Sequence, residues 1–599
     1  MTEEPKPKDS FDGKTMSGAE MVVQALIDQG VERVFGYPGG AVLPIFDEIY
    51  QQNSFEHILV RHEQAAGHAA EGYARSTGKV GVMLVTSGPG ATNTVTALQD
   101  ALMDSIPLVC FSGQVPTTLI GTDGFQEADT VGITRPCTKH NWLVKDVNDL
   151  ARIIHEAFYI AQTGRPGPVL IDIPKDVQFA SGVYTAPRSI PRQSYRPQLD
   201  GNAKAIEYAV SMLAEAKKPV IYTGGGVISS GANAVRLLRE LVALGDFPIT
   251  STLMGLGAYP ASGKNWLGML GMHGTYEANM TMHDCDVMLA IGARFDDRIT
   301  GRLDAFAPKA RIIHIDIDPS SINKTVQVEV PIVGDVAHVL ENMTRSLRAL
   351  KPVPNKEARK VWWDEINHWR ARNCLAYKHR SDVIMPQYAI KRLYELTKDK
   401  KAYITTEVGQ HQMWTAQYYG FEEPRHFMTS GGSGTMGYGF PASIGVQIAH
   451  PDALVICVAG DASIQMNIQE LATAMQHKTP VKVFILNNHY MGMVRQWQQL
   501  LHGNRLSNSY TDAMPDFVKL AEAYGAVGIR CSKPDELDGK IKEMLECDKP
   551  VFFDCVVAKQ ENCFPMIPSG RAHNDMLLPD EANDETIQNA IDAKGRSLV

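Results

Sequence analysis

The sequence lacks a long apolar run, an excess of basic residues and any clustered cysteine motif. No apolar run approaches the ~18 residues that a membrane-spanning helix needs, so no membrane span is expected. The formal net charge of −9 offers no basic surface, and a nucleic-acid partner is therefore not expected. The nine cysteines are scattered without a C-x-x-C pair. This usage argues against a zinc site and favours a reducing compartment.

The N-terminal residues also lack the features of a targeting segment. Residues 1–15 (MTEEPKPKDSFDGKT) are polar and mix lysine with acidic residues. A secretory signal needs an apolar segment, and a transit peptide avoids acids and favours arginine. The sequence therefore predicts a disordered tail over 1–15 and a cytoplasmic protein.

What the chain does contain is a regular alternation of strand-like and helix-like segments. At 599 residues it is too long for one core. The alternation predicts an α/β fold class with three doubly wound parallel-sheet domains, at residues 16–185, 202–350 and 385–563. The first and third domains share a layout of strand, glycine-rich break and helix. This layout suggests two copies of one fold on either side of a different middle domain.

Three segments are expected to lie outside these domains. Residues 186–201 are rich in proline and lack periodicity, which is typical of a linker. A second linker with a charged, helical continuation is expected over 351–384. The composition of residues 564–599 favours disorder, and a lid that orders on binding is the alternative.

A metal site is predicted at the end of two apolar runs in the third domain. Leu454–Val458 and Val481–Leu486 are typical of buried parallel strands, with a crossover helix expected over Met466–Gln476. The runs lead to Asp461 and Asn488, which would lie at one edge of the sheet. Their oxygen ligands suit Mg²⁺ beside a diphosphate. Taken alone, a bare Asp and Asn are better explained as ordinary polar residues that cap strands, and only the whole string of motifs reverses this interpretation.

Two further motifs have both a structural and a functional interpretation. Glu63 opens a helix after an apolar run, and such a glutamate is normally a solvated residue favoured by the helix dipole. Gly432, Gly434 and Gly437 form a G-x-G-x-x-G pattern, but no convincing buried strand precedes it, as a dinucleotide site requires. These glycines more plausibly let the backbone approach a flat ligand, with Met436 as an apolar wedge.

The middle domain has its own candidates for a nucleotide site. Gly224–Val227 follows a strand and precedes a helix, which is typical of an anion site. Arg294, Arg298, Asp316 and Asp318 follow other strands. Arg165, in the first domain, adds a guanidinium suited to a diphosphate. Each residue alone is explained by a surface or capping role, and together they indicate a second nucleotide site.

In combination, these motifs resemble the catalytic subunits of the acetohydroxyacid synthase (acetolactate synthase) family of thiamine diphosphate enzymes. The resemblance covers about residues 16–575 in order. It rests on Gly460-Asp461, Asn487-Asn488, HEQAAGHAAEGYAR, SGPGATN, GTDGFQEAD, GRPGPVLIDIPKDV, GMLGMHG, GARFDDR and GMVRQWQ. Ala462 stands where many thiamine diphosphate enzymes have glycine, a small change that leaves cofactor binding in place.

The resemblance implies pyrimidine-binding, FAD-binding and diphosphate-binding domains, in that order. The implied cofactors are thiamine diphosphate, Mg²⁺ and an FAD that is structural and non-redox. The implied reaction decarboxylates pyruvate and condenses the hydroxyethyl carbanion with pyruvate or 2-oxobutyrate, giving 2-acetolactate or 2-aceto-2-hydroxybutyrate. This is the first common step of branched-chain amino-acid biosynthesis. The implied partners are a second copy of the chain, in a homodimer or homotetramer, and a separate regulatory small subunit.

The resemblance also assigns roles to residues of this chain. Glu63 would activate the cofactor, with Gln126, Phe125 and Lys175 in the substrate channel and Met493 and Trp497 at the acceptor. Mg²⁺ would be held by Asp461, Asn488 and the carbonyl of Tyr490. The remaining thiamine diphosphate residues would be Gly40, Pro89, Asn93, Val408, Gly409, Gln410, His411, Gly434, Met436, Gly460, Ala462, Ser463, Met491 and Gly492. The FAD residues would be Arg165, Gly224, Gly225, Gly226, Met272, His273, Gly292, Arg294, Asp296, Arg298, Asp316, Ile317 and Asp335.

Two rival functions share this pattern. An FAD-dependent pyruvate oxidase would use the same cofactors, with a flavin that pyruvate reduces. A glyoxylate-using carboligase is disfavoured because such relatives replace the activating glutamate, which Glu63 preserves. A non-catalytic cofactor-binding relative is the alternative from another class, and the presence of Glu63, Asp461 and Asn488 argues against it.

Overall fold

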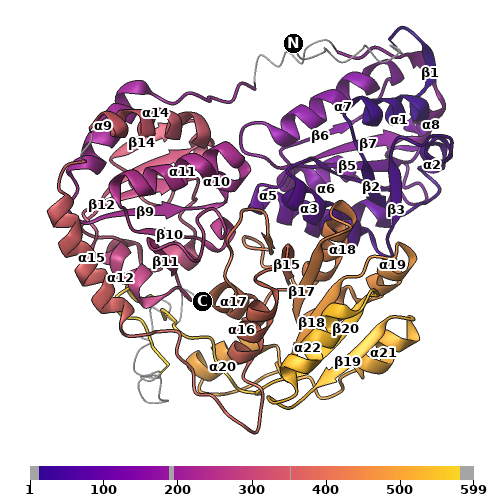
Figure 1. Ribbon diagram of the computed structural model, residues 1–599. Coiled ribbons are helices and arrows are strands. Elements are labelled where there is room, and N and C mark those ends of the chain that lie inside the picture. The colour runs from indigo at the N-terminus through magenta and orange to yellow at the C-terminus, as the bar shows by residue number, and fades with distance from the viewer. Residues whose placement is uncertain (1–11, 188–194, 351–352, 569, 580–599) are drawn as a thin grey trace. The chain divides into compact units, whose positions relative to one another are not determined.

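Three six-stranded sheets organise the part of the chain that the computed structural model describes, which is residues 12–187, 195–350, 353–568 and 570–579 (Figure 1). Neighbouring strands within each of these sheets run parallel. The predicted α/β class with three parallel-sheet domains is therefore confirmed. The chain forms two compact units, Met1–Arg196 with one sheet and Pro197–Val599 with the other two. Among the described residues, no helix has both the length and the apolar character needed to cross a membrane.

The first sheet has the strand order β3-β2-β4-β5-β7-β6. Its strands are β2 (Arg33–Gly36), β3 (Glu56–Leu59), β4 (Gly81–Val85), β5 (Leu108–Gln114), β6 (His140–Leu143) and β7 (Pro168–Pro174). The helices of this unit are α1 (Gly18–Asp28), α2 (Leu43–Tyr50), α3 (Glu63–Thr77), α4 (Pro89–Thr92), α5 (Val95–Asp104), α6 (Thr130–Thr134), α7 (Val147–Gln162) and α8 (Lys175–Phe179). The short strands β1 (Thr15–Ser17) and β8 (Ser181–Val183) pair antiparallel beside it. Helix α1 begins at a capping box formed by Ser17 and Glu20.

The middle sheet has the order β11-β10-β9-β12-β13-β14. Its strands are β9 (Pro219–Thr223), β10 (Ile249–Ser251), β11 (Trp266–Met269), β12 (Val287–Ile291), β13 (Arg311–Asp316) and β14 (Val330–Val333). Its helices are α9 (Ala203–Glu215), α10 (Gly225–Ser229), α11 (Ala232–Gly245), α12 (Tyr276–Asp284), α13 (Asp297–Thr300), α14 (Val336–Ala349) and α15 (Lys356–Arg370). Helix α15 falls in the predicted linker 351–384, yet it packs on this domain, and Trp362 Nε1 donates to the carbonyl of Pro219 at 3.1 Å. The buried tryptophans of α15 make it part of the middle core rather than a connection.

The third sheet has the order β16-β15-β17-β18-β20-β19. Its strands are β15 (Ala402–Thr406), β16 (Phe427–Met428), β17 (Leu454–Gly460), β18 (Lys482–Asn487), β19 (Val527–Cys531) and β20 (Val551–Val556). Its helices are α16 (Pro386–Thr397), α17 (Gln410–Tyr418), α18 (Gly439–Ala449), α19 (Leu471–Gln476), α20 (Gly492–Leu501), α21 (Phe517–Ala523) and α22 (Leu537–Glu546). The apolar runs predicted as neighbouring strands, β17 and β18, are paired in parallel.

The strand orders confirm that the first and third domains share one fold. Counted from the first strand of each parallel sheet, both follow the order 2-1-3-4-6-5, whereas the middle sheet follows 3-2-1-4-5-6. The second order is that of dinucleotide-binding folds. In sheets of either kind, ligands bind at the carboxyl ends of the strands where the order reverses. These edges are therefore the places to look for a site.

The prediction of one crossover helix over Met466–Gln476 was wrong in its first half. The connection consists of two 3₁₀ turns, Ser463–Met466 and Ile468–Glu470, followed by the short helix α19. Asn467 interrupts the helix with φ −133°, and its amide donates to the carbonyl of Gly437 at 2.7 Å. This long-range hydrogen bond satisfies Asn467 outside a helix, and local sequence does not reveal it.

The expectation of disorder beyond Cys563 was wrong for residues 564–568 and 570–579. Met566 and Leu577 exchange both backbone hydrogen bonds, at 3.0 and 2.8 Å. His573 is buried and its Nε2 lies 2.6 Å from the carbonyl of Ile299 in the middle domain. Of the other expected tail and linker segments, residues 1–11, 188–194, 351–352 and 580–599 lie outside the described residues. The expectation of disorder over 1–15 was wrong at its end, where Thr15 begins β1.

Candidate functional site

A pocket lies at the carboxyl ends of β15, β17 and β18 in the third domain. The residues that line it are Val408, Gly409, Gln410, His411, Trp414, Met436, Gly460, Asp461, Ala462, Ser463, Leu486, Asn488, Tyr490, Met491, Gly492, Met493 and Val494. Most of them are residues that the sequence predicted to bind thiamine diphosphate. Trp414, Leu486 and Val494 were not predicted, and the predicted Gly434 is not part of the lining. The folding of the sheet therefore brings together four separate segments of the sequence, 408–414, Met436, 460–463 and 486–494.

Asp461 is the most unusual polar group of this pocket. Its side chain is buried, and neither carboxylate oxygen has a hydrogen-bond partner. Burial raises the pKa of Asp461 to about 7, against the effect of nearby backbone N–H groups. A buried carboxylate without partners is costly unless a cation compensates it. Its hard oxygen ligands fit Mg²⁺.

The loop after β18 holds the second predicted metal ligand. Asn488 Oδ1 accepts a hydrogen bond from the backbone N–H of Tyr490 at 3.0 Å, which leaves this oxygen a second lone pair. His489 has φ +61°, a left-handed conformation that turns the chain sharply. The backbone of Met491 donates to Ser509 at 2.9 Å and Thr511 donates to His489 at 3.0 Å. The loop is thus held in place from both sides.

Helix α17 begins inside the same pocket. Gln410 Nε2 donates to Gln496 Oε1 at 2.8 Å and to the carbonyl of Glu561 at 2.9 Å. A Cβ added to Gly492 would lie 2.1 Å from Gln410 Oε1, so any larger residue there would displace the end of this side chain. Burial lowers the pKa of His411 to about 3, and its imidazole is therefore neutral.

Glu407, directly after β15, is a buried acid that sequence reasoning missed. It accepts hydrogen bonds from the backbone N–H groups of Gly437 at 2.6 Å and Phe440 at 3.1 Å. Burial raises its pKa to about 7. Glu407 thereby holds the glycine-rich segment that precedes α18. Its position directly after a strand was the only signal in the sequence.

The first domain places Glu63 at the N-terminus of α3. Its Oε2 accepts a hydrogen bond from Asn93 Nδ2 at 2.9 Å, so two residues predicted for one cofactor meet. Pro89 begins α4, whose last residues lead to Asn93. Glu63 is half-buried, as a hydrogen-bonding carboxylate beside a ligand would be.

The segment that carries Gln126 approaches the turn at Gly88, directly before α4. Gln126 has φ +61°, and a Cβ added to Gly88 would lie 2.8 Å from its carbonyl oxygen. Gly40 follows β2 and adjoins Ala41, whose N–H lies 3.4 Å from Thr86 Oγ1. Lys175 begins α8 after β7. Phe125 is 90% exposed in the chain, which is unusual for a large apolar side chain.

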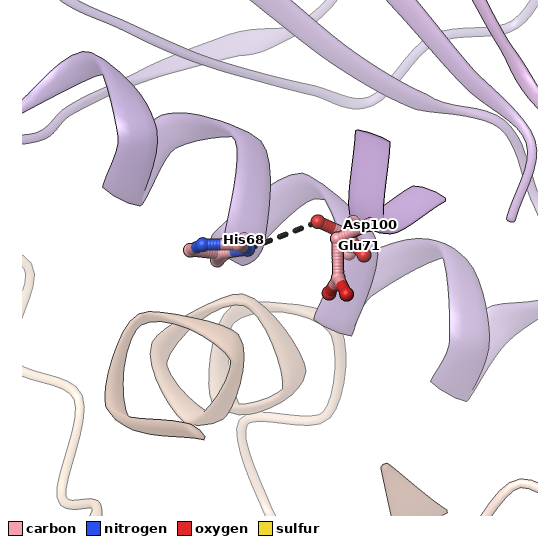
Figure 2. A group of neighbouring side chains, drawn as sticks. All are labelled: His68, Glu71 and Asp100. Atoms are coloured by element: carbon pink, nitrogen blue, oxygen red, sulfur yellow. Dashed lines mark hydrogen bonds and ion pairs between the residues drawn. The ribbon is translucent and has the colours of Figure 1, made fainter. Parts of the chain in front are cut away.

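A buried polar cluster links α3 to α5 in the same domain (Figure 2). Side-chain ligand atoms of His68, Glu71 and Asp100 lie within 4.8 Å of one another. Burial lowers the pKa of His68 to about 4 and raises the pKa of Glu71 well above its usual range. Neutral His68 donates from Nδ1 to Glu71 Oε1 at 3.0 Å, and Glu71 shares a hydrogen bond with Asp100. The raised pKa means that Glu71 keeps its proton, which reduces the repulsion between the carboxyl groups of Glu71 and Asp100.

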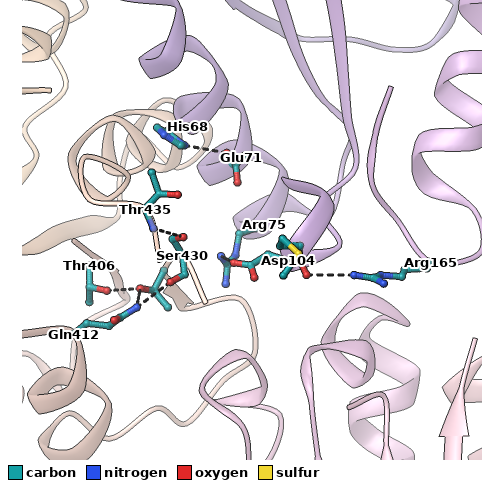
Figure 3. Close-up of polar contacts among 11 residues, drawn as sticks. His68, Glu71, Arg75, Asp104, Arg165, Thr406, Gln412, Ser430 and Thr435 are labelled. Carbon is teal, nitrogen blue, oxygen red and sulfur yellow. Dashed lines mark hydrogen bonds and ion pairs between the residues drawn. The ribbon is translucent and has the colours of Figure 1, made fainter. Parts of the chain in front are cut away.

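Other polar contacts within the first domain and within the third domain appear in Figure 3. In the first domain, Arg75 lies 3.6 Å from Asp104. Arg165, predicted for FAD, donates to Ser105 Oγ at 2.8 Å and to the carbonyl of Leu102 at 3.1 Å. These bonds hold its guanidinium at the end of α5. In the third domain, the amide of Gln412 and the hydroxyls of Thr406, Thr429 and Ser430 anchor the segment that leads to Thr435.

The middle domain brings its glycine turns together at the point where the strand order reverses. A Cβ added to Gly226 would lie 2.7 Å from the Cα of Gly292. The turns after β9 and β12 therefore touch, and Gly224 and Gly225 lie in the first of them. This is the position at which such sheets bind dinucleotides.

The predicted acidic and basic residues of the middle domain have local partners as well. Asp335 and Asp296 cap the N-termini of α14 and α13, and Asp316 accepts from the N–H of Asp318 at 2.8 Å. Ile317 directly follows β13 and Arg294 follows β12. Arg298 lies in α13, the short helix after β12. The remaining pair, Met272 and His273, contacts the C-terminal segment: Ile567 N–H donates to Met272 at 2.8 Å, and His273 Nδ1 lies 3.1 Å from the carbonyl of Pro565.

Comparisons with known proteins agree with this architecture. Residues 16–133 match the N-terminal TPP binding domain of thiamine pyrophosphate enzymes, residues 206–343 match the central domain, and residues 407–555 match the C-terminal TPP binding domain. The acetolactate synthase large subunit of Haemophilus influenzae is 52% identical over 94% of this chain and 98% of its own length. The large subunit of acetolactate synthase isozyme 3 of Escherichia coli is likewise 52% identical, over the same shares. The large subunit from Porphyra purpurea is 45% identical over 94% of this chain and 96% of its own.

Proposed function

The chain belongs to the family of acetolactate synthase large subunits, which are thiamine pyrophosphate enzymes, and from this premise we propose how its residues make 2-acetolactate. The reaction decarboxylates pyruvate and condenses the remaining two-carbon unit with a second 2-keto acid. Thiamine diphosphate, when bound, supplies the electron sink that this decarboxylation requires. The residues of the chain have to bind it, orient it, hold protons and exclude water.

The third-domain pocket carries the proposal, through the buried and unpaired oxygens of Asp461. We assign Asp461, the Asn488 amide oxygen and the Tyr490 carbonyl to Mg²⁺, which neutralises a diphosphate in this pocket. Gln410 and neutral His411 line the same wall and present uncharged polar groups. The fit rests on the donor chemistry, since carboxylate and amide oxygens suit a hard cation.

In the first domain we assign proton handling to Glu63. Its carboxylate is oriented by Asn93, which leaves its other oxygen to exchange a proton with a ring nitrogen of an aminopyrimidine. A general acid–base group of this kind contributes about 10²–10⁴-fold to a rate. Gln126, Phe125 and Lys175 form the proposed channel for 2-keto acids, in which Lys175 attracts the substrate carboxylate.

Met493 and Trp497 are proposed to form the acceptor pocket. Both lie on α20, and Met493 lines the pocket described above. An indole gives the larger 2-oxobutyrate more apolar contact than pyruvate. One additional methylene is worth about 10- to 200-fold in discrimination, which sets the upper limit for this preference.

The middle domain is proposed to hold FAD in a structural role. Its strand order and the touching turns of Gly226 and Gly292 support a dinucleotide there. A homodimer or homotetramer, a separate regulatory small subunit and a cytoplasmic location complete the proposal. The "large subunit" of the relatives' names supports the separate small subunit, and the resemblance supports the homodimer or homotetramer.

The test is a product assay with pyruvate and 2-oxobutyrate at equal concentrations, with and without added Mg²⁺, thiamine diphosphate and FAD. We expect both acetohydroxy acids, a strict need for Mg²⁺ and thiamine diphosphate, and no net flavin reduction. Anaerobic mixing with pyruvate separates the rival oxidase. Flavin bleaching at the turnover rate would contradict the synthase, and the absence of either product would also contradict it.

A further inference from the structure

Helix α20 presents two different stripes of side chains. Met493 and Trp497 are four residues apart and share one stripe, whereas Arg495 and Gln499 share another. Because an α-helix turns through about 100° per residue, the two stripes lie on roughly opposite sides of the helix. Whatever holds the second stripe therefore sets the direction in which the first one points.

The second stripe is held by a buried arginine. The Arg495 side chain is 1% exposed. Its Nη1 donates to Asn562 Oδ1 at 2.6 Å and to Gln499 Oε1 at 2.8 Å, and its Nη2 donates to the carbonyl of Glu561. Asn562 Nδ2 in turn donates to the same Gln499 Oε1 at 3.1 Å. Arg495, Gln499 and Asn562 thus form a closed hydrogen-bonded ring, the Arg495 clamp.

The partners of this cation have a consequence for specificity. The described side-chain acceptors of Arg495 are neutral amides, and burial lowers the pKa of its guanidinium. A buried charge is often no more stabilising than apolar residues of similar volume, and one documented use is to select a single geometry. Directional bonds from one planar guanidinium to two chain segments define one rotation of α20 against residues 561–563.

The neighbouring residue connects the clamp to the pocket wall. Gln496 is fully buried, and its Oε1 accepts from Gln410 Nε2 and from the backbone of Cys563, both at 2.8 Å. Trp497, next along the helix, packs in a cluster with Leu500, Leu501, Met566 and Leu577. Met566 and Leu577, which pair through backbone hydrogen bonds, belong to the cluster against which the indole packs. The segment that begins at Glu561 thus supports three features: the Arg495 clamp, the pocket wall at Gln410, and the residues that contact the indole.

We propose that Arg495 is a positioning residue for acceptor selection. The Arg495 clamp fixes the rotation of α20, and this rotation sets where Trp497 stands relative to an incoming 2-keto acid. The inference rests on the proposed function, in which Trp497 contacts the acceptor. Loss of the clamp allows α20 to turn, widens the acceptor pocket and reduces the preference for 2-oxobutyrate over pyruvate.

The experiment compares Arg495→Met and Arg495→Lys with the wild type, as holoenzymes supplied with equal pyruvate and 2-oxobutyrate. The readout is the ratio of 2-aceto-2-hydroxybutyrate to 2-acetolactate. Arg495→Met is expected to lower this ratio roughly fivefold, within the limit that one methylene allows. Arg495→Lys retains one donor toward Glu561 and is expected to give an intermediate ratio. A combination with Trp497→Leu is expected to add no further change, because the clamp acts through the indole.

A matched control separates positioning from general stability. Arg392 forms a bidentate pair with Asp538 at 2.8 and 2.7 Å, between α16 and α22. Arg392→Met is expected to lower the melting temperature and leave the product ratio unchanged. An unchanged ratio in Arg495→Met, even with a slower rate, would overturn the inference.

Two further outcomes are assigned in advance. If Arg495→Met does not fold, Asn562→Ala decides, because it removes one acceptor of the clamp and retains the arginine. The same fall in ratio supports the inference, and an unchanged ratio overturns it. Failure of the wild type to form either product would contradict the proposed function itself, and not the clamp.

Discussion

The first and third domains have the same strand order, yet the acidic residues at the carboxyl edges of their sheets differ in chemistry. At the third edge, Asp461 is buried and its oxygens have no hydrogen-bond partner. At the first edge, Glu63 is half-buried and its Oε2 is already bonded to Asn93. An unpaired buried acid is suited to a cation, whereas an oriented, partly exposed acid is suited to proton exchange. On the proposed assignment, one fold therefore serves binding in one copy and activation in the other.

The two domains also differ at equivalent buried aspartates. Asp172 lies on β7 and Asp554 on β20, which are the last strands of their sheets in chain order. Both aspartates are 1% exposed. Asp172 accepts from Ser112 at 2.6 Å and Gln114 at 2.9 Å, which are neutral donors. Asp554 accepts from Arg530 at 2.8 Å and Asn487 at 2.9 Å. The corresponding strands thus carry a neutral network in one domain and an ion pair in the other.

The largest expected effect is at the third edge. Asp461→Ala is expected to weaken thiamine diphosphate and Mg²⁺ binding by more than about 100-fold, because even residues outside the direct ligand set cost 10- to 100-fold in metal affinity. Isothermal titration calorimetry measures this change. Asp452→Ala is the control, since Asp452 is exposed near the opposite end of β17. Retained affinity in Asp461→Ala would remove the metal assignment.

The next effect is expected at the carboxyl edge of the first sheet, where the rate should fall while cofactor binding is retained. Glu63→Gln is expected to lower kcat by about 10²–10⁴-fold while cofactor affinity changes by only a few-fold. Steady-state product formation and calorimetry on the same sample distinguish the two quantities. Glu56→Gln, at the exposed start of β3, is expected to change neither. If Glu63→Gln lost binding and kept its rate constant at saturation, the proposed division of labour would be reversed.

A smaller effect compares the equivalent aspartates. Asp554→Asn is expected to lower the free energy of unfolding by about 1–3 kcal/mol, because the change removes the anion that accepts from Arg530. Asp172→Asn is expected to cost less, since the amide oxygen still accepts from Gln114 and the amide NH₂ donates to the Ser112 hydroxyl, which rotates to accept. Denaturant unfolding of both variants measures the difference. Equal losses would show that the charge of Arg530 does not distinguish the two positions.

The last prediction concerns the pH dependence of stability at one of these aspartates, Asp172. Burial raises the pKa of Asp172 to about 7 from 3.8, so the folded state keeps a proton that the unfolded state releases. This group therefore loses stability as the pH rises from about 4 through 7. Asp172→Asn removes that loss, and its melting temperature relative to the wild type should rise between pH 5 and pH 8. A pH-independent difference would indicate that Asp172 is ionised throughout.

Local sequence patterns predicted a large part of the fold and of the third-domain site. The runs that became β17 and β18 were visible because buried parallel strands are continuously apolar. Asp461 and Asn488 were found because they follow these runs directly. The residues that escaped prediction depend on distant partners: Glu407 bonds to Gly437 and Phe440, and Asn467 breaks a helix by bonding to Gly437. No periodicity marks such contacts.

Composition was a poor guide for segments that fold onto other domains. Residues 564–579 are rich in turn-forming and polar residues, yet Met566 and His573 are buried against distant parts of the chain. Likewise, α15 is charged overall and was expected to connect domains, but Trp362, Ile366 and Trp369 join the middle core. A few buried side chains decide the position of such segments, and an average over many residues conceals them.

The sequence by itself determined the three α/β domains, the strand ends and the motif residues at those ends, because strand periodicity and glycine-rich turns are local properties. Only the tertiary structure decided the strand orders, and with them the likeness of the first and third domains. It also decided that Arg495, Gln499 and Asn562 meet in a clamp behind Trp497. The reason is physical: these contacts join residues that are far apart in sequence, and they form only once packing has fixed where each strand and helix lies.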